Sequence, residues 1–515
     1  MSVTEREPDT ETTERGAAPV AWWPVGGIAA VTAALLLATI HRYGYSMDEL
    51  YFVAAGRHPD WGYADQPPFV PLLAALMDGL FPGSLFWLRA PDALVVAAGV
   101  VLCALIAREL GGRRRAQVMA AAAFAIAFLN HGGQIDTGTF NLVAWTSCTW
   151  LVARWVRLHN EGRTGWSADL PLLWAGVATA VALQVKYLIP IFWAGVGIGL
   201  LVAGPRRMLT RPLLWAGAAF AVLTAAPGLV WQAAHGWPQA EMTAVLSEET
   251  ELMWGGRLAF LPQALMTMGL AIGTILGCYG LWKLLRSPEL RPHRYLGWAA
   301  LVVIVAVVAA NGRFTYVAGV FPLLFAAGAV QLQERRPARW WRWVPTWPVF
   351  ALSALLTLLG LPIDSPSEVR PATSPDDRRA RFDTLVQFGW PEFTDSVARV
   401  WRTLPAGPPG GAAVVTKLYW QAGALEVLGP DRGLPRPHSP HRGYWDFGRP
   451  GDGVTTVLYV GGTEESLRRH FGAVRRAGTV EGRIGIAIGT PIWICERPLK
   501  PWSRLWPEMR SLTLR

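Results

Sequence analysis

Long apolar stretches separated by short polar segments recur along the chain from Val20 to Leu361. A helix that crosses the hydrocarbon core of a bilayer needs about 20 residues, and shorter stretches suit helices packed inside a bundle. The pattern predicts about eleven membrane-spanning helices, near Val20 to Ile40, Pro91 to Leu110, Ala116 to Asn130, Thr139 to Ala153, Leu170 to Val185, Leu188 to Ala203, Pro212 to Trp231, Phe260 to Trp282, Tyr295 to Ala310, Tyr316 to Gln331 and Val344 to Leu361.

Leu170 to Ala203 is long enough for one tilted helix, but Lys186 and Pro190 interrupt it near its centre. We therefore predict two short helices at this place.

Of the polar segments between spans, two are long: 43–89 and 232–257. The first contains the apolar run Phe69 to Phe81, which is too short to span and is predicted to lie in the plane of the membrane interface.

The composition changes abruptly after Leu361. Residues 362–381 are polar and are predicted to form a linker to a separate domain, 382–515. In that domain strand-like runs (412–418, 454–460 and 491–496) alternate with helix-like runs (392–404, 419–428 and 464–477). Such alternation predicts a small α/β domain with a mostly parallel sheet. At the other end of the chain, residues 1–19 are polar and predict a disordered tail ahead of an uncleaved first span.

Charge supports the membrane assignment and orients it. Charged residues make up 16% of the chain and hydrophobic residues 52%, with a net charge of +10. Basic residues cluster on alternate loops, which is the positive-inside pattern and not a nucleic-acid-binding face. The loops assigned to the cytoplasm carry Arg108, Arg113, Arg114, Arg115, Arg154, Arg157, Arg163, Arg206, Arg207, Arg211, Lys283, Arg286, Arg291, Arg294, Arg335, Arg336, Arg339 and Arg342.

The opposite loops up to Leu361 carry few basic residues, namely Arg42, Arg57, Arg89, Lys186, Arg257 and Arg313. The N-terminus is therefore predicted to be cytoplasmic, and an odd number of spans places the C-terminal domain outside.

Three of the four cysteines, Cys103, Cys148 and Cys278, fall in apolar segments, where they act as small hydrophobes. The histidines lack the spacing of metal ligands, so no metal site is predicted from them.

Two adjacent acids, Asp48 and Glu49, follow the first span. Ser46 and Glu49 have the spacing of a capping box, and acids are favoured in the first turn of a helix. A purely structural role is therefore one interpretation of this pair.

A family resemblance supplies another interpretation. Residues 48–52 (DELYF), 55–58 (AGRH) and 61–68 (WGYADQPP) resemble the first extracytoplasmic loop of bacterial GT-C glycosyltransferases of the protein O-mannosyltransferase and aminoarabinose-transferase clan (glycosyltransferase family 39-like). Further segments are similar to the same clan, namely 184–187, 231–238, 311–316, 389–392, 421–424 and 491–495.

The resemblance implies a membrane-embedded enzyme that moves a monosaccharide from a polyprenyl-phosphate carrier to an extracytoplasmic acceptor, usually with inversion. Asp48 then corresponds to the catalytic base, since a carboxylate can take the proton of an acceptor hydroxyl as the new bond forms. Glu49 either orients the acceptor or only caps the helix. Asp136 is either the N-cap of the fourth span or a second acid that faces the site.

Lys186 lies at membrane depth, where an unpaired charge costs about 2.5–3.5 kcal/mol. We expect it to hold the lipid phosphate together with Arg313, Arg89 and Tyr316, although each arginine could instead extend to the lipid headgroups. A phosphate leaving group needs positive charge nearby more than it needs a proton donor.

Three residues of the long outer loops, Arg57, Asp65 and His235, are candidates for contact with substrate. Asp65 and His235 are also typical turn residues in their contexts. No cofactor is predicted with certainty, although some members of the clan use a divalent cation.

The resulting prediction is a hexosyl- or pentosyltransferase of the bacterial plasma membrane that acts on an envelope glycan, lipid or protein. Its partners would be the polyprenyl-phosphate sugar, that acceptor and the bilayer, with no nucleic acid. The alternative is a flippase or transporter of lipid-linked sugars without bond chemistry. The C-terminal domain is expected to bind the acceptor polymer or a partner protein.

Overall fold

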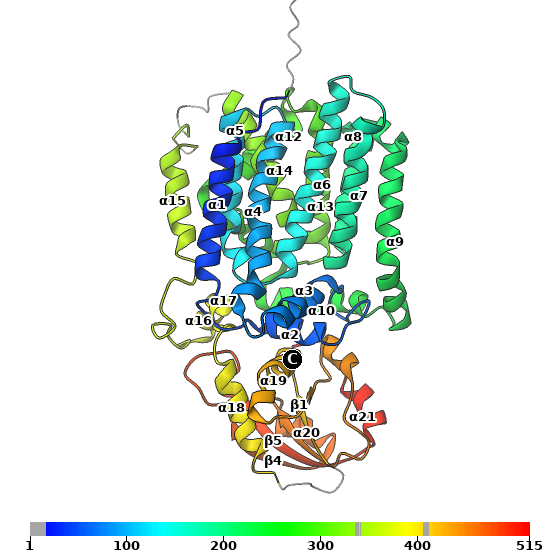
Figure 1. Ribbon diagram of the computed structural model, residues 1–515, viewed down its shortest axis with the longest axis vertical. Helices are drawn as coiled ribbons and strands as arrows, with labels where there is room; N and C mark the ends of the chain where they lie inside the picture. The colour runs from blue at the N-terminus through cyan, green and yellow to red at the C-terminus, as the bar shows by residue number, and fades with distance from the viewer. Residues whose placement is uncertain (1–16, 335–338, 340, 344, 405–410, 515) are drawn as a thin grey trace, which may run out of the picture.

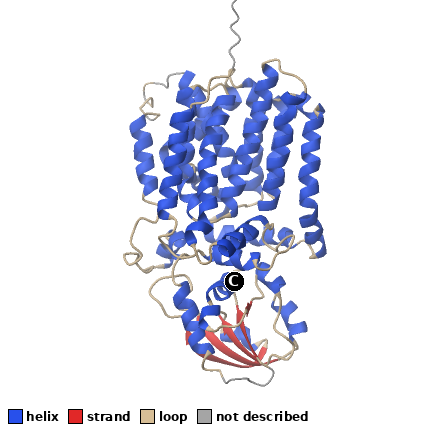
Figure 2. Ribbon diagram, viewed as in Figure 1, coloured by secondary structure: helices blue, strands red, loops and turns tan. Residues whose placement is uncertain are grey.

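The computed structural model of the chain describes residues 17–334, 339, 341–343, 345–404 and 411–514. It has two parts, a bundle of long helices and a smaller part in which helices accompany a sheet (Figures 1 and 2). The smaller part lies at the end of the bundle opposite the start of α1 (Trp22–Thr39). The predicted fold class, a polytopic helical membrane protein with a C-terminal α/β domain, is confirmed.

Each predicted apolar stretch coincides with helical structure. The bundle contains α1, α4 (Leu85–Glu109), α5 (Arg114–Phe128), η1 (Leu129–Gly133), α6 (Thr137–Asn160), α7 (Trp166–Val185), α8 (Ile189–Ala203), η2 (Arg206–Thr210), α9 (Pro212–Ala234), α11 (Gly256–Thr267), α12 (Leu270–Arg286), η3 (Arg291–His293), α13 (Arg294–Ala309), η4 (Phe314–Val320), α14 (Phe321–Glu334) and α15 (Trp347–Leu358). Among the described residues, seven helices are long and apolar enough to span a membrane, or eight if one bent pair counts as a span, so the predicted number of spans is not confirmed. Part of the predicted tail (residues 1–16), Arg335, Arg336 and Val344 lie outside the described residues.

The bundle contains two breaks in its helices. The predicted break near Lys186 is confirmed, since α7 ends at Val185 and α8 begins at Ile189. The second break was not predicted: α11 and α12 replace the single span expected near Phe260 to Trp282 and meet at a bend of 108°. Gly269 lies in the bend with φ of 86°, and a Cβ there would lie 2.9 Å from the Ala127 backbone. Glycine is therefore required at this position both for its conformation and for the close approach.

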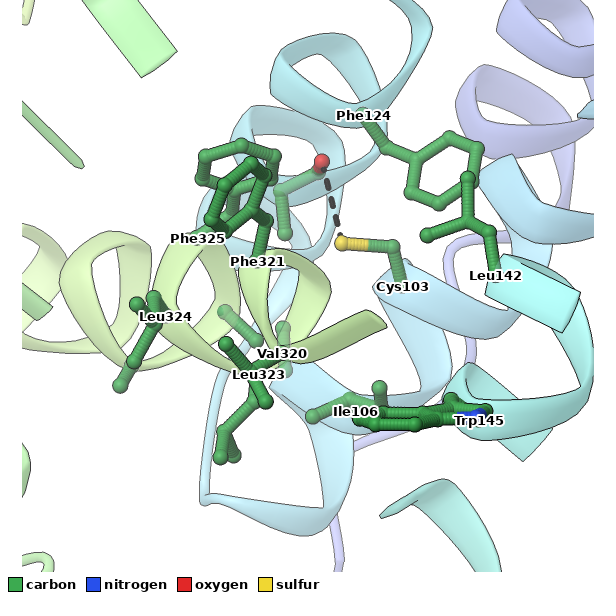
Figure 3. Packing of buried hydrophobic residues seen from close by; sticks show 14 of the residues in the cluster. Cys103, Ile106, Phe124, Leu142, Trp145, Val320, Phe321, Leu323, Leu324 and Phe325 are labelled. Carbon is green, nitrogen blue, oxygen red and sulfur yellow. Dashed lines mark hydrogen bonds between the residues drawn. The ribbon is translucent and has the colours of Figure 1, made fainter. Parts of the chain in front are cut away.

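Small residues allow the helices of the bundle to approach closely, as is usual where helices associate in lipid. Cys103 of α4 lies among Phe124, Trp145 and Phe325, and its Sγ is 3.4 Å from the Ala120 carbonyl oxygen (Figure 3). All three cysteines lie on helices of the bundle, as predicted: Cys103 and Cys148 are buried, and Cys278 is exposed on the surface of α12.

Three helices lie at the end of the bundle that faces the C-terminal domain: α2 (Met47–Gly56), α3 (Phe69–Leu80) and α10 (Pro238–Trp254) (Figure 1). One face of α3 is buried through Val70 and Ala74, whereas Leu72 and Leu76 on another face are exposed. This arrangement suits the predicted position of the segment in the interface plane.

The C-terminal part contains a five-stranded mixed sheet in the order β2-β1-β3-β5-β4. The pairs β1–β2 and β1–β3 are parallel, and β3–β5 and β4–β5 are antiparallel, so the predicted mostly parallel sheet is only half correct. Its elements are α16 (Pro375–Ala380), α17 (Phe382–Leu385), α18 (Trp390–Trp401), β1 (Ala412–Thr416), α19 (Tyr419–Leu428), η5 (Pro430–Arg432), β2 (Pro437–His438), η6 (Arg442–Phe447), β3 (Thr456–Val460), α20 (Glu464–Arg468), β4 (Phe471–Thr479), β5 (Pro491–Pro498) and α21 (Trp502–Met509).

One helix prediction in this part was wrong. Residues 464–477 form the short helix α20 and then most of strand β4, because β4 pairs along β5 and adds an antiparallel edge to the sheet. The segment 362–381, predicted to be a linker, is held against the folded parts. Val369 is buried, and its carbonyl oxygen accepts a hydrogen bond from Arg483.

Helix α19 of the C-terminal part packs directly on α2, which lies in the long segment 43–89 between α1 and α4. The contact depends on Gly423, where an added Cβ would lie 3.0 Å from the backbone of Leu50 and Tyr51. Two helix backbones can approach this closely only where one of them has no side chain. The close contact sets the distance between the C-terminal domain and the segment that carries Asp48.

We expect Gly423→Val to lower the free energy of unfolding by about 1–3 kcal/mol, because overpacking must push α19 away from α2. Thermal unfolding of the purified full chain in detergent, together with limited proteolysis, measures the effect. The control is Gly451→Val, since Gly451 is exposed and an added Cβ there meets no atom within 4 Å. Equal stability of the two variants would contradict the role given to Gly423.

Candidate active site

Asp48 lies in the first turn of α2, at the end of the bundle covered by the C-terminal domain. The residue as a whole is half-buried, and Oδ1 accepts a 2.7 Å hydrogen bond from the hydroxyl of Tyr419. The two residues are 371 positions apart in the chain. The site around Asp48 is therefore formed jointly by the segment 43–89 and the C-terminal domain.

Burial raises the pKa of the Asp48 carboxyl above its ordinary value. The hydrogen bond from Tyr419 opposes this effect, Asp136 adds to it, and the cations Arg442 and Arg313 lower the pKa. A carboxylate with a raised pKa is a stronger base than one in water, while nearby cations keep it able to ionise. This combination is what a general base requires.

Glu49 is fully buried and has a structural role. Its two oxygens accept hydrogen bonds of 2.7 Å each from Nε and Nη2 of Arg89, and further bonds from the backbone N–H groups of Ser46 and Ile135. Of the two expectations for Glu49, the structure supports the helix cap, because no oxygen is left for a substrate.

The expectation that Arg89 holds a lipid phosphate was wrong. The guanidinium is 1% exposed and donates to Glu49 and to the carbonyl oxygens of Ile40 and Gly44. Each of its three nitrogens donates to the protein and the group is buried, so it is not exposed to a ligand. Arg89 instead ties α4 to the start of α2.

Asp136 is exposed and caps α6, since its carboxylate accepts a 2.9 Å hydrogen bond from the Gly138 N–H. It also interacts electrostatically with Asp48. The structure supports the helix cap, and the alternative, a second acid that faces the site, stays a prediction. Its neighbour Asp92 is buried on α4, where Oδ1 accepts from the Asp136 N–H.

Lys186 and Tyr316 line a cavity of about 370 Å³ beside the site. The Lys186 ammonium lies 4.6 Å from the centre of the Tyr316 ring. The rest of the lining is mostly apolar and includes Leu188, Leu246 and Val307, while Asp65 stands on the same wall. A cavity with one cation and apolar walls suits a ligand that has an anionic group and a hydrocarbon chain.

Asp65 connects this cavity to Asp48. The Tyr51 hydroxyl donates a 2.8 Å hydrogen bond to Asp65, and the Tyr51 ring contacts the Tyr419 ring at 4.7 Å between centroids. Burial raises the pKa of Asp65 to about 6, against the lowering effects of Arg442 and of the hydrogen bond from Tyr51. Asp65 is thus a residue of the site and not only a turn residue.

Glu249 of α10 lies between two arginines of the site. Its Oε1 is 2.6 Å from Nη2 of Arg442, and its Oε2 is 3.5 Å from Nη2 of Arg313. Arg442 takes a φ of 50°, a conformation that costs a non-glycine residue about 1–2 kcal/mol. Strain of this kind is typically kept where a side chain must be held in one place.

Two expected substrate-loop residues lie away from the cavity. Arg57 pairs with Asp78 at 2.9 Å and donates to the carbonyl oxygen of Glu426. His235 is exposed, is stacked on Trp231 and bonds to the carbonyl oxygen of that residue. Neither side chain lines the cavity, because local partners hold both of them elsewhere.

Sequence reasoning missed Tyr419, Arg442 and the position of Glu249. The segment 421–424 carried a family resemblance, and Tyr419 lies two residues before it. Nothing local in the sequence shows that this tyrosine meets Asp48, since that contact exists only in the tertiary structure. Among the described residues, no three His, Cys, Asp or Glu side chains converge into a group that could hold a metal ion.

Comparison with known proteins agrees with the geometry. Residues 65–231 match the family described as dolichyl-phosphate-mannose-protein mannosyltransferase. The chain is similar to ArnT from Cupriavidus metallidurans bound to undecaprenyl phosphate, with 15% identity and a TM-score of 0.54 over 92% of this chain and 98% of that one. ArnT from the same organism in the apo state gives 14% identity and a TM-score of 0.55, over 91% and 97% of the two chains. No curated protein matches the sequence.

The alignment with ArnT extends over nearly the whole of both chains and includes the C-terminal domain. The chain therefore has the GT-C fold, and the resemblance carried by its motifs is confirmed.

We expect Arg89→Met to lower the free energy of unfolding by about 3–5 kcal/mol, because Glu49 would remain as a buried charge without its partner. The double variant Glu49→Gln, Arg89→Met should recover part of this loss. Thermal unfolding of the purified protein measures both. As a control, Arg57→Met removes an arginine from a partly exposed pair and should cost no more than about 1 kcal/mol. If Arg89→Met were no more destabilised than Arg57→Met, the structural role of the pair would be refuted.

Proposed function

We propose that this protein is a glycosyltransferase that moves a monosaccharide from a polyprenyl-phosphate carrier to a hydroxyl or phosphate of an extracytoplasmic acceptor. The observation that carries the proposal is the pairing of two features at one end of the bundle: a half-buried carboxylate with a raised pKa, Asp48, and a mostly apolar cavity that contains Lys186. The GT-C fold shared with an ArnT structure that holds undecaprenyl phosphate supports the same conclusion.

Asp48 acts as the base. The acceptor hydroxyl is a weak nucleophile, and the carboxylate takes its proton while the acceptor oxygen bonds to the anomeric carbon of the sugar. The bond between that carbon and the carrier phosphate breaks on the opposite face, so the configuration inverts. The carrier leaves as a phosphate, with its negative charge on oxygen.

Lys186 and Arg313 stabilise the charge that develops on the leaving phosphate. Lys186 is well placed for this role, because its ammonium lies against the Tyr316 ring, and among the described residues no salt bridge occupies it. A cation without an anionic partner in a largely apolar cavity is stabilised by an anionic ligand. The apolar walls then accept the first part of the polyprenyl chain.

The chemistry takes place at the extracytoplasmic surface of a bacterial plasma membrane. The distribution of basic residues supports a cytoplasmic N-terminus, and the C-terminal domain lies at the opposite end of the bundle. Asp48, Lys186 and the C-terminal domain then share the outer side. The transferred sugar is a hexose or a pentose, and the acceptor belongs to the cell envelope.

We expect Asp48→Asn to reduce kcat for sugar transfer by about 10²–10⁴-fold, because the amide cannot accept the acceptor's proton. The assay follows labelled sugar from a polyprenyl-phosphate donor into acceptor-containing membranes. Asp60→Asn is the control, since Asp60 is exposed on the same loop and bonds only to the adjacent Trp61 N–H. Full transfer by Asp48→Asn would remove this residue from the role of base. Translocation of the lipid-linked sugar by wild-type protein, without transfer, would favour the transporter alternative.

A second expectation concerns the donor. Lys186→Met should raise the KM for the polyprenyl-phosphate sugar about ten- to hundredfold, which corresponds to the loss of one charge-assisted hydrogen bond to phosphate. Lys283→Met is the matched control, because Lys283 also lies over an aromatic ring, Trp282 at 4.3 Å, but does not line the cavity. An unchanged KM in Lys186→Met would place the phosphate elsewhere.

A further inference from the structure

Tyr419 reaches Asp48 from a domain that is distant in sequence. It is the first residue of α19, its side chain is almost fully buried, and its hydroxyl donates to Asp48 Oδ1 at 2.7 Å. A hydrogen bond from a neutral hydroxyl to a carboxylate is charge-assisted and directional. It therefore restricts rotation of the Asp48 carboxyl group.

Tyr419 is itself held on several sides. Its backbone N–H donates to Nδ1 of His441, and the two rings stack with 15° between their planes. The Arg442 guanidinium also lies over the Tyr419 ring, 5.2 Å from its centre. On the membrane side the Tyr51 ring meets it edge to face. A side chain enclosed in this way has one available position for its hydroxyl.

The last described residues of the chain support this arrangement. The backbone N–H of Arg442 donates to the Ser511 carbonyl oxygen, and its Nε donates to the Leu512 carbonyl oxygen. Nε2 of His441 is 3.0 Å from the Thr513 carbonyl oxygen. The end of the chain thus folds back to fix the two residues that hold Tyr419.

The direction of the hydrogen bond is also determined. Burial and the nearby Asp48 carboxylate raise the pKa of Tyr419 well above its ordinary value, so the phenol keeps its proton. The hydroxyl donates, and Oδ1 of Asp48 is the acceptor. Oδ2 is then the oxygen left for the proton of the incoming acceptor.

We propose that Tyr419 is a positioning residue that orients the Asp48 carboxylate so that Oδ2 faces the acceptor, and that the C-terminal domain is consequently part of the catalytic unit. The inference rests on the glycosyltransferase function proposed above. It extends that function, because it assigns the C-terminal domain a direct effect on the chemical step in place of acceptor binding alone.

Tyr419→Phe tests the proposal, because it removes the hydroxyl and keeps the ring that packs against Tyr51 and His441. With the carboxylate free to rotate, kcat should fall about ten- to hundredfold. The KM for the donor should stay unchanged, since Lys186 and the cavity are untouched. The thermal midpoint of the variant, measured alongside, should stay close to that of the wild-type protein.

The pH profile separates positioning from a purely structural role. The hydrogen bond from Tyr419 favours ionised Asp48, so its loss raises the pKa of Asp48. The base must be ionised to act, and the acid limb of kcat should therefore move to higher pH in Tyr419→Phe. The other charged groups that act on Asp48 stay in place, namely Asp136, Arg442, Arg313 and Asp65.

Tyr444→Phe is the matched control. Tyr444 is a buried tyrosine of the same domain that donates to a carboxylate, Glu426, but not to Asp48. It should keep the wild-type kcat and acid limb. If Tyr419→Phe also kept both, or lost activity and stability together without moving the acid limb, the positioning role would be overturned.

Measuring Asp48→Asn in parallel distinguishes the two proposals. An inactive Asp48→Asn with an unchanged Tyr419→Phe refutes only the positioning role. An active Asp48→Asn refutes the assignment of Asp48 as the base, and the positioning role with it.

Discussion

The buried ion pair between Glu49 and Arg89 is the interaction on which the site depends. Taking two charges out of water costs several kcal/mol per ion, and only good geometry with additional hydrogen bonds offsets that cost. Both conditions are met here, since Glu49 also accepts from two backbone N–H groups and Arg89 also donates to two carbonyl oxygens. The pair joins the end of α1, the start of α2, α4 and the segment before α6 at one point. Asp48 is the residue directly before Glu49 in α2. The ion pair that fixes Glu49 therefore also fixes the backbone that carries Asp48.

The second constraint on Asp48 comes from outside the bundle. Because Gly423 lets α19 lie against the backbone of α2, Tyr419 can reach Asp48, and Arg442 can reach Glu249 of α10. The covering domain also withdraws the carboxylate from water and so raises its pKa, while it supplies the donor and the cation that keep the carboxylate ionisable. The same contact thus makes the base stronger and holds it in place.

Features that depend on neighbouring residues in the chain could be predicted from the sequence, whereas features that depend on contacts between distant residues could not. The apolar stretches, the break at Lys186 and the strands 412–416, 456–460 and 491–498 depend on local patterns, and all were predicted. The strand β4 was mistaken for helix, since its identity depends on pairing with β5. Arg89 was assigned to a ligand because an arginine near the end of a span has the same local sequence whether its partner is a phosphate or a buried glutamate. Tyr419 was missed because its role depends on a hydrogen bond to Asp48, a residue of another domain.

A comparison of Arg89 with Lys186 shows how the structure separates two residues that were given the same expected role, binding of the lipid phosphate. Both are cations near the ends of apolar helices. Each nitrogen of the Arg89 guanidinium donates to a protein acceptor, so binding a phosphate would require breaking hydrogen bonds that already compensate for its burial. Lys186 lies at a helix break beside a cavity, and its ammonium contacts the ring of Tyr316. A ring face stabilises an ammonium by about 0.5–2 kcal/mol, less than a phosphate would in the same low-dielectric surroundings. Of the two cations, Lys186 is therefore the one whose energy a phosphate-bearing ligand can lower.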